Sequence, residues 1–184
     1  MNPAFIVDGF TEKNILEKLC PGQPIRLSIN GKDVSLKKAA EKIVAIIRLL
    51  NNRNYPIVIL TDREKRSDDF KKVADDLKQE VIKLLAEKQI VMDIRVGVAD
   101  RMIENWILGD ADALGNPPEL PTEIDGLAGK SWMKKIIPNY SETADGPDLF
   151  LKADGRKTYA QSPSFKHFID QLKDLDCFYL NFNK

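Results

Sequence analysis

The sequence is poor in two residue types that often build catalytic and metal sites. Its 184 residues include one histidine and two cysteines. Because His167 is the single histidine, we expect no histidine metal cluster and no His-dependent catalytic triad. His167 also falls in an expected amphipathic helix, so we interpret it as structural. Cys20 and Cys177 lie far apart and no secretory signal precedes them, so we expect two reduced thiols.

Long apolar runs and an excess of one charge are also missing. No stretch approaches the roughly 20 residues of a membrane span, and the N-terminus lacks the pattern of a signal peptide, so we expect a cytoplasmic protein without a membrane partner. Lys and Arg number 28 and Asp and Glu number 28, which predicts no strong autonomous binding to nucleic acid. A content of 43% hydrophobic and 30% charged residues is typical of a globular domain.

Strand and helix patterns alternate through residues 1–115. Apolar runs predict strands at 4–7, 57–60 and 90–98. Helices are predicted to begin after Thr11, Ser35 and Ser67, with a short helix at 102–108, and Asn30-Gly31 is typical of a hairpin turn within 25–34. The alternation predicts an α/β core with a mostly parallel sheet flanked by helices.

The second half of the chain, residues 116–184, is interrupted by prolines and glycines. We expect it to form an irregular, loop-rich lobe packed on the 1–115 core, the two together making one structural domain. Short helices are predicted near 131–137 and 164–175, and a last strand at 177–182.

Carboxylates follow two of the expected strands. Asp62 and Glu64 come after the 57–60 strand, Asp8 follows the first strand, and Glu12 lies one helical turn further on. If those strands are neighbours, the carboxylates meet at one sheet edge. We expect Trp106 to be a structural residue, buried under the sheet or against the Pro-rich lobe. Grouped carboxylates favour binding of Mg²⁺. The alternative is that these residues form a solvent-exposed turn and cap helices, which would give the same sequence.

Four segments resemble small stand-alone Toprim-fold proteins, which are similar to the nuclease domain of the overcoming-lysogenization-defect (OLD) family: VDGFTEKNIL, VILTDRE, ENWILGDADAL and SPSFKHFIDQL. The resemblance implies a Toprim-like sheet and Mg²⁺- or Mn²⁺-dependent phosphodiester hydrolysis in DNA or RNA. It also implies a defence or mobile-element setting with an ATPase partner.

Carried over by position, the resemblance implies that Asp8, Asp62 and Glu64 hold the metal. Glu12 is the acidic residue of the family's Thr-Glu step, and Glu12, Asp62 and Glu104 take catalytic roles. Asp8 is one methylene shorter than the family's Glu, and Glu64 is one longer than its Asp. Because Mg²⁺ demands near-octahedral geometry, these changes bear on catalysis more than on the fold.

Several other residues allow two interpretations. Glu104 is either a further ligand or an exposed helix residue beside a buried Trp106. Asp110 and Asp112 are typical of a helix-ending turn. The segment Gly129-Lys130-Ser131 resembles the end of a P-loop, but Ile124 stands where that motif needs its first glycine, so we expect no ATP binding there.

Basic residues near the carboxylates suggest contacts with phosphate. We predict nucleic-acid binding by Arg63, Lys65 and Arg66, with simple solvation as the alternative. A second basic group could form part of a groove that binds nucleic acid. It consists of Lys152, Arg156 and Lys157.

The leading interpretation is a Mg²⁺-dependent nuclease that binds nucleic acid weakly or with help from a partner. One rival is a Toprim-like interaction subunit that has lost activity. The other is a phosphotransferase that uses Asp62 as its nucleophile.

Overall fold

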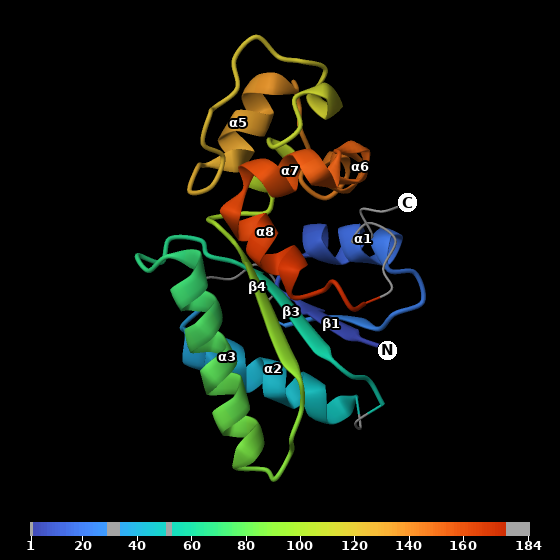
Figure 1. The fold of residues 1–184 in the computed structure, drawn as a ribbon, viewed down its shortest axis with the longest axis vertical. Coiled ribbons are helices and arrows are strands. Elements are labelled where there is room, and N and C mark those ends of the chain that lie inside the picture. Colours follow the sequence, from blue (N-terminus) through green and yellow to red (C-terminus); the bar gives the residue numbers. More distant parts are fainter. Residues whose placement is uncertain (1, 29–33, 51–52, 176–184) are drawn as a thin grey trace.

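A four-stranded parallel sheet forms the centre of the protein in the computed structural model, which describes residues 2–28, 34–50 and 53–175 (Figure 1). The strands are β1 (Ala4–Val7), β2 (Ile25–Leu27), β3 (Ile57–Asp62) and β4 (Ile94–Ala99), in the order β2-β1-β3-β4. Every pairing is parallel. This confirms the α/β class and agrees with a Toprim-like arrangement.

Helices cover both faces of the sheet. One face packs against α1 (Phe10–Leu19) and α8 (Pro163–Asp170), and the other against α2 (Leu36–Leu49) and α3 (Phe70–Ala86). Successive residues of a strand point to opposite faces, so Val58 and Leu60 join the first core while Ile57 and Ile59 join the second. Because helices cover both faces of the sheet, successive residues of β3 from Ile57 to Leu60 are all apolar.

Helix starts agree with the sequence in part. Ser35 caps α2 as predicted, since its side chain accepts a hydrogen bond from the Lys38 backbone. Two predicted caps are wrong: Gly9 precedes α1 in place of Thr11, and Asp69 caps α3 in place of Ser67 by accepting from two backbone N–H groups. Strand β3 continues to Asp62 and a turn follows, which delays the start of α3.

Two expected strands also need revision. The β4 strand begins at Ile94 and not at residue 90, because the turn after α3 includes the left-handed residue Gln89. The predicted hairpin turn falls on residues 29–33, outside the described residues, and β2 itself pairs in parallel with β1. The strand expected at 177–182 also lies outside the described part of the chain.

Short helices from residues 104–161 lie at one end of the sheet (Figure 1). They are α4 (Glu104–Ile107), the 3₁₀ turn η1 (Asp112–Leu114), α5 (Gly129–Ile136), α6 (Asp145–Lys152) and α7 (Gly155–Gln161). Trp106 is 1% exposed, and its ring packs among Phe150, Phe165 and Phe168. Its indole N–H donates to Ser164 Oγ at 2.8 Å. The predicted burial of Trp106 is confirmed.

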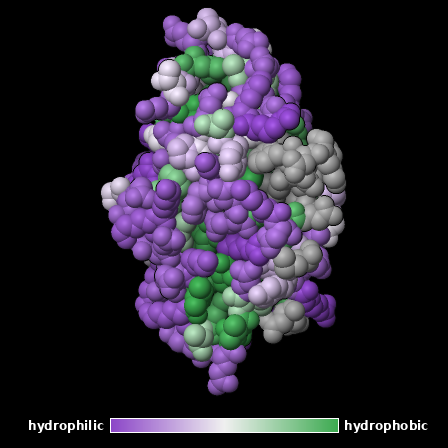
Figure 2. Space-filling model, in the orientation of Figure 1, coloured by the Kyte–Doolittle hydropathy of each residue, from purple (hydrophilic) through white to green (hydrophobic). Residues whose placement is uncertain are grey.

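Most of the face seen in Figure 2 is hydrophilic; apolar residues show mainly in the lower half of the view, with a smaller group near the top. No helix within the described ranges is long and apolar enough to cross a membrane.

Cys20 is disulfide-bonded, so the expectation of a reduced thiol is wrong at this position. Cys177 lies outside the described residues.

Candidate functional site

The strand order places a crevice at the ends of β1 and β3. The chain adds β2 on one side of β1 and then β3 and β4 on the other, so the direction of winding reverses between β1 and β3. In open α/β sheets, ligands bind outside the carboxyl ends of the strands at such a reversal. Asp8 directly follows β1 and Asp62 ends β3. The prediction that they lie on neighbouring strands at one edge is confirmed.

Asp8 is fixed by groups from the neighbouring strand. The Thr61 hydroxyl donates to Asp8 Oδ2 at 2.6 Å, and the Asp62 backbone N–H donates to the same oxygen at 3.2 Å. All three residues are buried, with exposed fractions of 6–7%. Asp8 therefore has a defined orientation towards the end of β3.

Glu12 enters the same site from the first turn of α1. A Cβ placed on Gly9 would lie 2.3 Å from Glu12 Oε2, so the carboxylate folds back over a position that only glycine leaves free. Glu12 is 4% exposed. Its place near the helix N-terminus favours negative charge, although burial opposes it.

Glu64 and Arg101 stand on adjacent turns in the left-handed region. Their φ angles are 56° and 77°, which residues other than glycine rarely adopt. The Glu64 N–H donates to the Arg101 carbonyl at 3.0 Å, which couples the turns after β3 and β4. Such backbone strain clusters at functional sites, and here it sets the position of Glu64 at the crevice.

Glu104 reaches the crevice from α4. It is 1% exposed, so the alternative of an exposed helix residue is wrong. The start of α5 packs tightly against it, because a Cβ on Gly129 would lie 3.1 Å from Glu104 Cβ and 2.1 Å from Asn105 Oδ1. This close approach brings Lys130, the next residue, to the same cavity.

These side chains surround a cavity of about 230 Å³, which we call the acidic cavity. It brings together all five carboxylates proposed from the sequence. Sequence reasoning missed Lys130 and Glu142, which pair across the cavity wall with Nζ and Oε2 2.9 Å apart. In the sequence, Lys130 stands out only through the likeness of Gly129-Lys130-Ser131 to the end of a P-loop. The lining residues are Asp8, Gly9, Phe10, Thr11, Glu12, Asp62, Glu64, Glu104, Lys130, Glu142 and Thr143.

Four carboxyl groups of the acidic cavity, those of Asp8, Glu12, Asp62 and Glu104, favour protonation. Burial, reinforced by the charge of Asp8, raises the pKa of Glu12 to about 8. Burial also raises the pKa of Glu104 to about 7, although Lys130 opposes the shift. The pKa of Asp62 lies well above its ordinary value because of burial and the charges of Glu12 and Asp8. Burial raises the pKa of Asp8 too, against hydrogen bonds that lower it.

Three carboxylate oxygens in the cavity are buried without a hydrogen-bond partner: Asp62 Oδ1 and both oxygens of Glu104. Buried polar atoms are normally satisfied, so their ligand is a proton, a water or a cation. Carboxylate oxygens suit Mg²⁺, which uses one or two of them together with waters. Within the described residues no group of three or more His, Cys, Asp and Glu side chains is arranged to hold a metal ion. A cation here would therefore rely on a pair of carboxylates completed by water or substrate.

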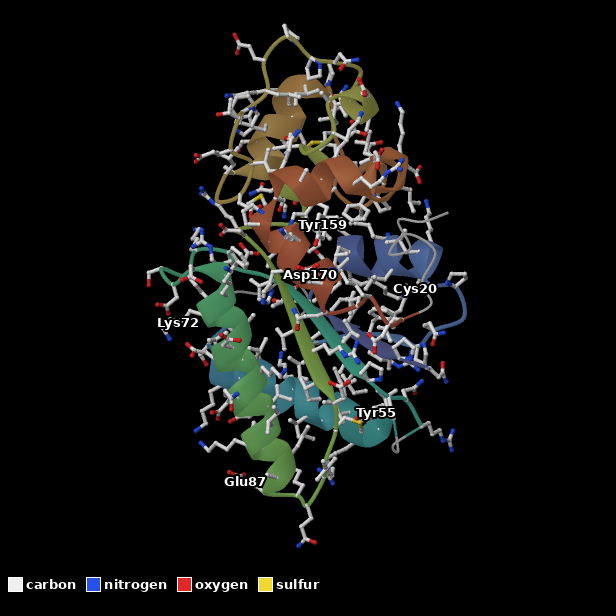
Figure 3. All side chains as sticks on the ribbon, viewed as in Figure 1. Cys20, Tyr55, Lys72, Glu87, Tyr159 and Asp170 are labelled. Atoms are coloured by element: carbon white, nitrogen blue, oxygen red, sulfur yellow. The ribbon has the colours of Figure 1, made fainter. Side chains whose placement is uncertain are left out.

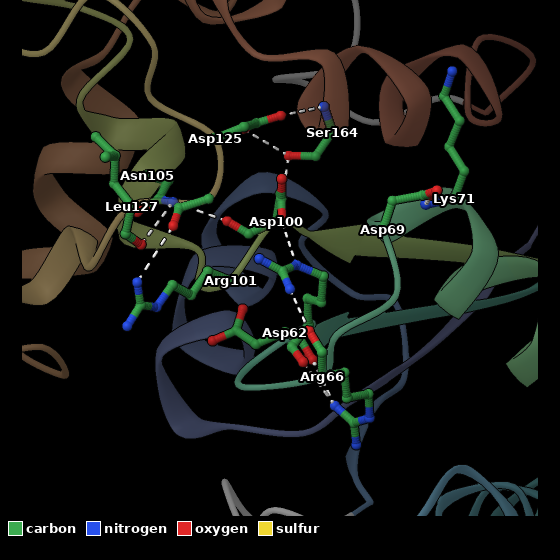
Figure 4. A network of polar contacts seen from close by, with 12 residues as sticks. Asp62, Arg66, Asp69, Lys71, Asp100, Arg101, Asn105, Asp125, Leu127 and Ser164 are labelled. Carbon is green, nitrogen blue, oxygen red and sulfur yellow. Dashed lines mark hydrogen bonds and ion pairs between the residues drawn. The ribbon is translucent and has the colours of Figure 1, made fainter.

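The basic residues Arg63 and Arg66 make contacts within the protein, and Figure 4 shows Arg66 in the polar network beside Asp62. Arg63 forms an ion pair with Asp100 and donates to the Arg66 carbonyl. Arg66 donates to the carbonyl oxygens of Asp62, Arg63 and Val34. Lys65 is exposed. The two arginines thus brace the turn after β3, and their role in nucleic-acid binding remains a prediction.

The other charged candidates lie in local structural contacts. Asp110 accepts from the backbone of Asp112 and Asp154 and pairs with Lys157, which confirms a structural turn. Arg156 pairs with Asp154. His167 makes an edge contact with the Phe70 ring, at 5.8 Å between centroids, and partial burial lowers its pKa.

Residues 7–173 match the family described as Domain of unknown function (DUF4276). The chain belongs to this family. The match includes every residue that lines the acidic cavity, so the cavity is a feature of the DUF4276 region. Searches among curated proteins and among solved structures found no significant match. The resemblance of this DUF4276 chain to Toprim nucleases therefore remains a hypothesis.

Proposed function

We propose that this DUF4276 protein is a Mg²⁺- or Mn²⁺-dependent nuclease that hydrolyses phosphodiester bonds in DNA or RNA in the cytoplasm. The observation that carries the proposal is the set of partnerless oxygens on Asp62 and Glu104, buried at the strand reversal. An acidic cavity repels a phosphodiester unless a cation neutralises it. In this proposal Asp8 and Asp62 hold that cation, with Glu64 at the rim.

The protein side chains have distinct roles in this proposal. A bound divalent cation would supply charge stabilisation at the phosphodiester oxygens. Glu104 and Glu12 have pKa values of about 7 and 8, so one of them can accept a proton from the attacking water near neutral pH. Lys130 contributes the positive charge within the lining. A weak grip on nucleic acid agrees with an ATPase partner that assists binding.

The experiment compares wild type with Asp62→Asn and Asp62→Ala on plasmid, single-stranded DNA and RNA, with Mg²⁺, with Mn²⁺ and with EDTA. We expect metal-dependent cleavage by wild type and its loss in both variants. Thermal melts should show folded variants, with stability equal to or above wild type, because carboxylate repulsion is relieved. Undiminished cleavage by a folded Asp62→Ala protein would remove Asp62 from the site.

A second candidate is an interaction subunit without activity. The observation that favours it is that no three ligands within the described ranges are arranged around one point. The absence of cleavage together with no metal-induced shift of the melting temperature would support this candidate. The disulfide at Cys20 is unusual for the cytoplasmic location proposed above, and titration of free thiols in unfolded protein would test whether it forms there.

A further inference from the structure

Phe10 is an apolar ring at the mouth of a cavity whose other lining is mostly charged. It is 51% exposed, and it lines the acidic cavity beside Glu12 and Thr143. Leaving a phenylalanine half in water forfeits much of the free energy of its burial. Phe10 belongs to neither of the two hydrophobic cores of the described residues. We propose that Phe10 stacks against a base of a single-stranded nucleic acid whose backbone enters the acidic cavity. This inference rests on the proposed function.

The first support is the rigid placement of Phe10. It is the first residue of α1, and the Lys13 N–H donates to the Gly9 carbonyl at 3.2 Å, which closes the first turn. The neighbouring loop is tied to the same helix, because Thr11 and Asn14 donate to the carbonyl oxygens of Glu142 and Thr143. A ring on a fixed backbone loses little entropy when a base stacks on it.

The second support is the scarcity of positive charge at the site. The cavity lining contains six carboxylates and one lysine, and Lys130 is already paired with Glu142. Arg63 and Arg66 make internal contacts. Attraction to phosphates is therefore weak, and a substrate needs a contact that does not depend on charge. Stacking on an aromatic ring is such a contact, and it tolerates every base.

The third support is the depth of the carboxylates. Glu12, Asp62 and Glu104 are 4%, 7% and 1% exposed, at the bottom of a cavity of about 230 Å³. A phosphodiester reaches them only by entering the cavity, which a base-paired duplex is too wide to do. Enzymes that act on a base inside a duplex use single strands or extrude the nucleotide, and a backbone that must enter an enclosed cavity meets the same steric limit. The substrate class is therefore single-stranded nucleic acid.

The experiment measures binding apart from cleavage. Fluorescence anisotropy of labelled oligothymidylate and oligouridylate is recorded with the Asp62→Asn protein in Mg²⁺, alone and combined with a change at Phe10. We expect Phe10→Ala to weaken binding about tenfold, a size typical of losing one stacked base. Phe10→Tyr should bind like the parent, whereas Phe10→Leu should resemble Phe10→Ala because it keeps the apolar volume without the ring.

Tyr55→Ala is the matched control. Tyr55 is 53% exposed and precedes β3, at the opposite end of the strand from the acidic cavity (Figure 3). It should leave binding unchanged. Failure of the Asp62→Asn protein to bind either oligonucleotide, equal binding of a duplex, or equal losses in Phe10→Ala and Tyr55→Ala would overturn the inference.

Two outcomes separate this inference from the proposed function. Phe10-dependent binding by a wild-type protein that cleaves nothing would support the stacking site and refute the nuclease. Metal-dependent cleavage with the same KM and kcat in wild type and Phe10→Ala, on single strands and duplexes alike, would support the nuclease and refute the stacking site.

Discussion

The hydroxyl of Thr61 donates a hydrogen bond of 2.6 Å to Oδ2 of Asp8, joining β3 to the residue that follows β1. This contact connects the fold to the site, because it orients Asp8 at the strand reversal. Hydrogen bonds to charged groups contribute about 1.5–3 kcal/mol, so their loss is measurable.

Thr61→Val removes this donor while keeping the shape of the side chain. We expect the free energy of unfolding to fall by about 1–3 kcal/mol at neutral pH, because Asp8 loses a partner in a buried position. The shift of the melting temperature on adding Mg²⁺ should shrink as well. Chemical denaturation and melts measure both effects. Thr61→Ser, which keeps the hydroxyl, is the control, and equal behaviour of Val and Ser variants would contradict the role of the hydrogen bond.

Gly9→Ala tests the position of Glu12. The Gly9 backbone is extended, at φ −131°, so alanine fits the backbone there, but its Cβ would lie 2.3 Å from Glu12 Oε2. Because that atom ends a flexible side chain, the carboxylate should move and the free energy of unfolding should change by less than about 1 kcal/mol. Metal-dependent activity should fall at least about tenfold, a cost typical of losing positioned acid–base catalysis. The activity of Glu12→Gln, made in the protein that keeps Gly9, gives the comparison. Full activity in Gly9→Ala would show that Glu12 needs no fixed position.

Stability should fall as pH rises from about 5 to 9. The pKa values of Glu12 and Glu104 are raised to about 8 and 7, above the ordinary value of 4.5. Between those values the folded state holds more protons than the unfolded state, so the free energy of unfolding decreases with pH. Each unit of pKa difference corresponds to about 1.4 kcal/mol. Urea denaturation across this range measures the slope.

The matched variant for the pH prediction is the double change Glu12→Gln and Glu104→Gln. It removes both titrating groups and should flatten the profile between pH 5 and 9, apart from contributions of Asp8 and Asp62. Mg²⁺ should stabilise wild type more at high pH than at low pH, since the cation competes with protons for the carboxylates. An unchanged slope in the double variant would place the titration elsewhere.

Arg63 and Asp100 should behave as a structural pair. Each side chain is 18% exposed, and their ion pair joins the turns after β3 and β4. We expect a double-mutant cycle with Arg63→Ala and Asp100→Ala to show a coupling energy of about 1 kcal/mol or more. The salt dependence of nucleic-acid binding should be the same in Arg63→Ala and wild type. A salt slope lower by about one would instead assign Arg63 to a phosphate contact.

The exposed neighbour Lys65 provides the comparison for Arg63. Its side chain is exposed in the same turn, so Lys65→Ala should leave the free energy of unfolding within about 0.5 kcal/mol of wild type. Any phosphate contact from this turn would come from Lys65, and it would appear as a lower salt slope in that variant alone.

Local patterns in the sequence determined β1, β3 and, apart from its start, β4, together with the flanking helices and the positions of Asp8 and Asp62 at strand ends. Apolar periodicity carries that information because each strand and helix must bury its own apolar face. The caps of α1 and α3 were mispredicted because several neighbouring residues can cap a helix equally well, and the length of the preceding turn decides among them.

Tertiary structure alone decided the strand order, the burial of Glu104, the arrival of Lys130 and Glu142 at the cavity, and the inward contacts of Arg63 and Arg66. The sequence does not show whether a glutamate or an arginine is exposed to solvent or buried. Its burial depends on contacts with chain segments that are far apart in sequence. Glu104 lies at the cavity because α5 packs against α4 through Gly129, a contact that local propensity does not encode.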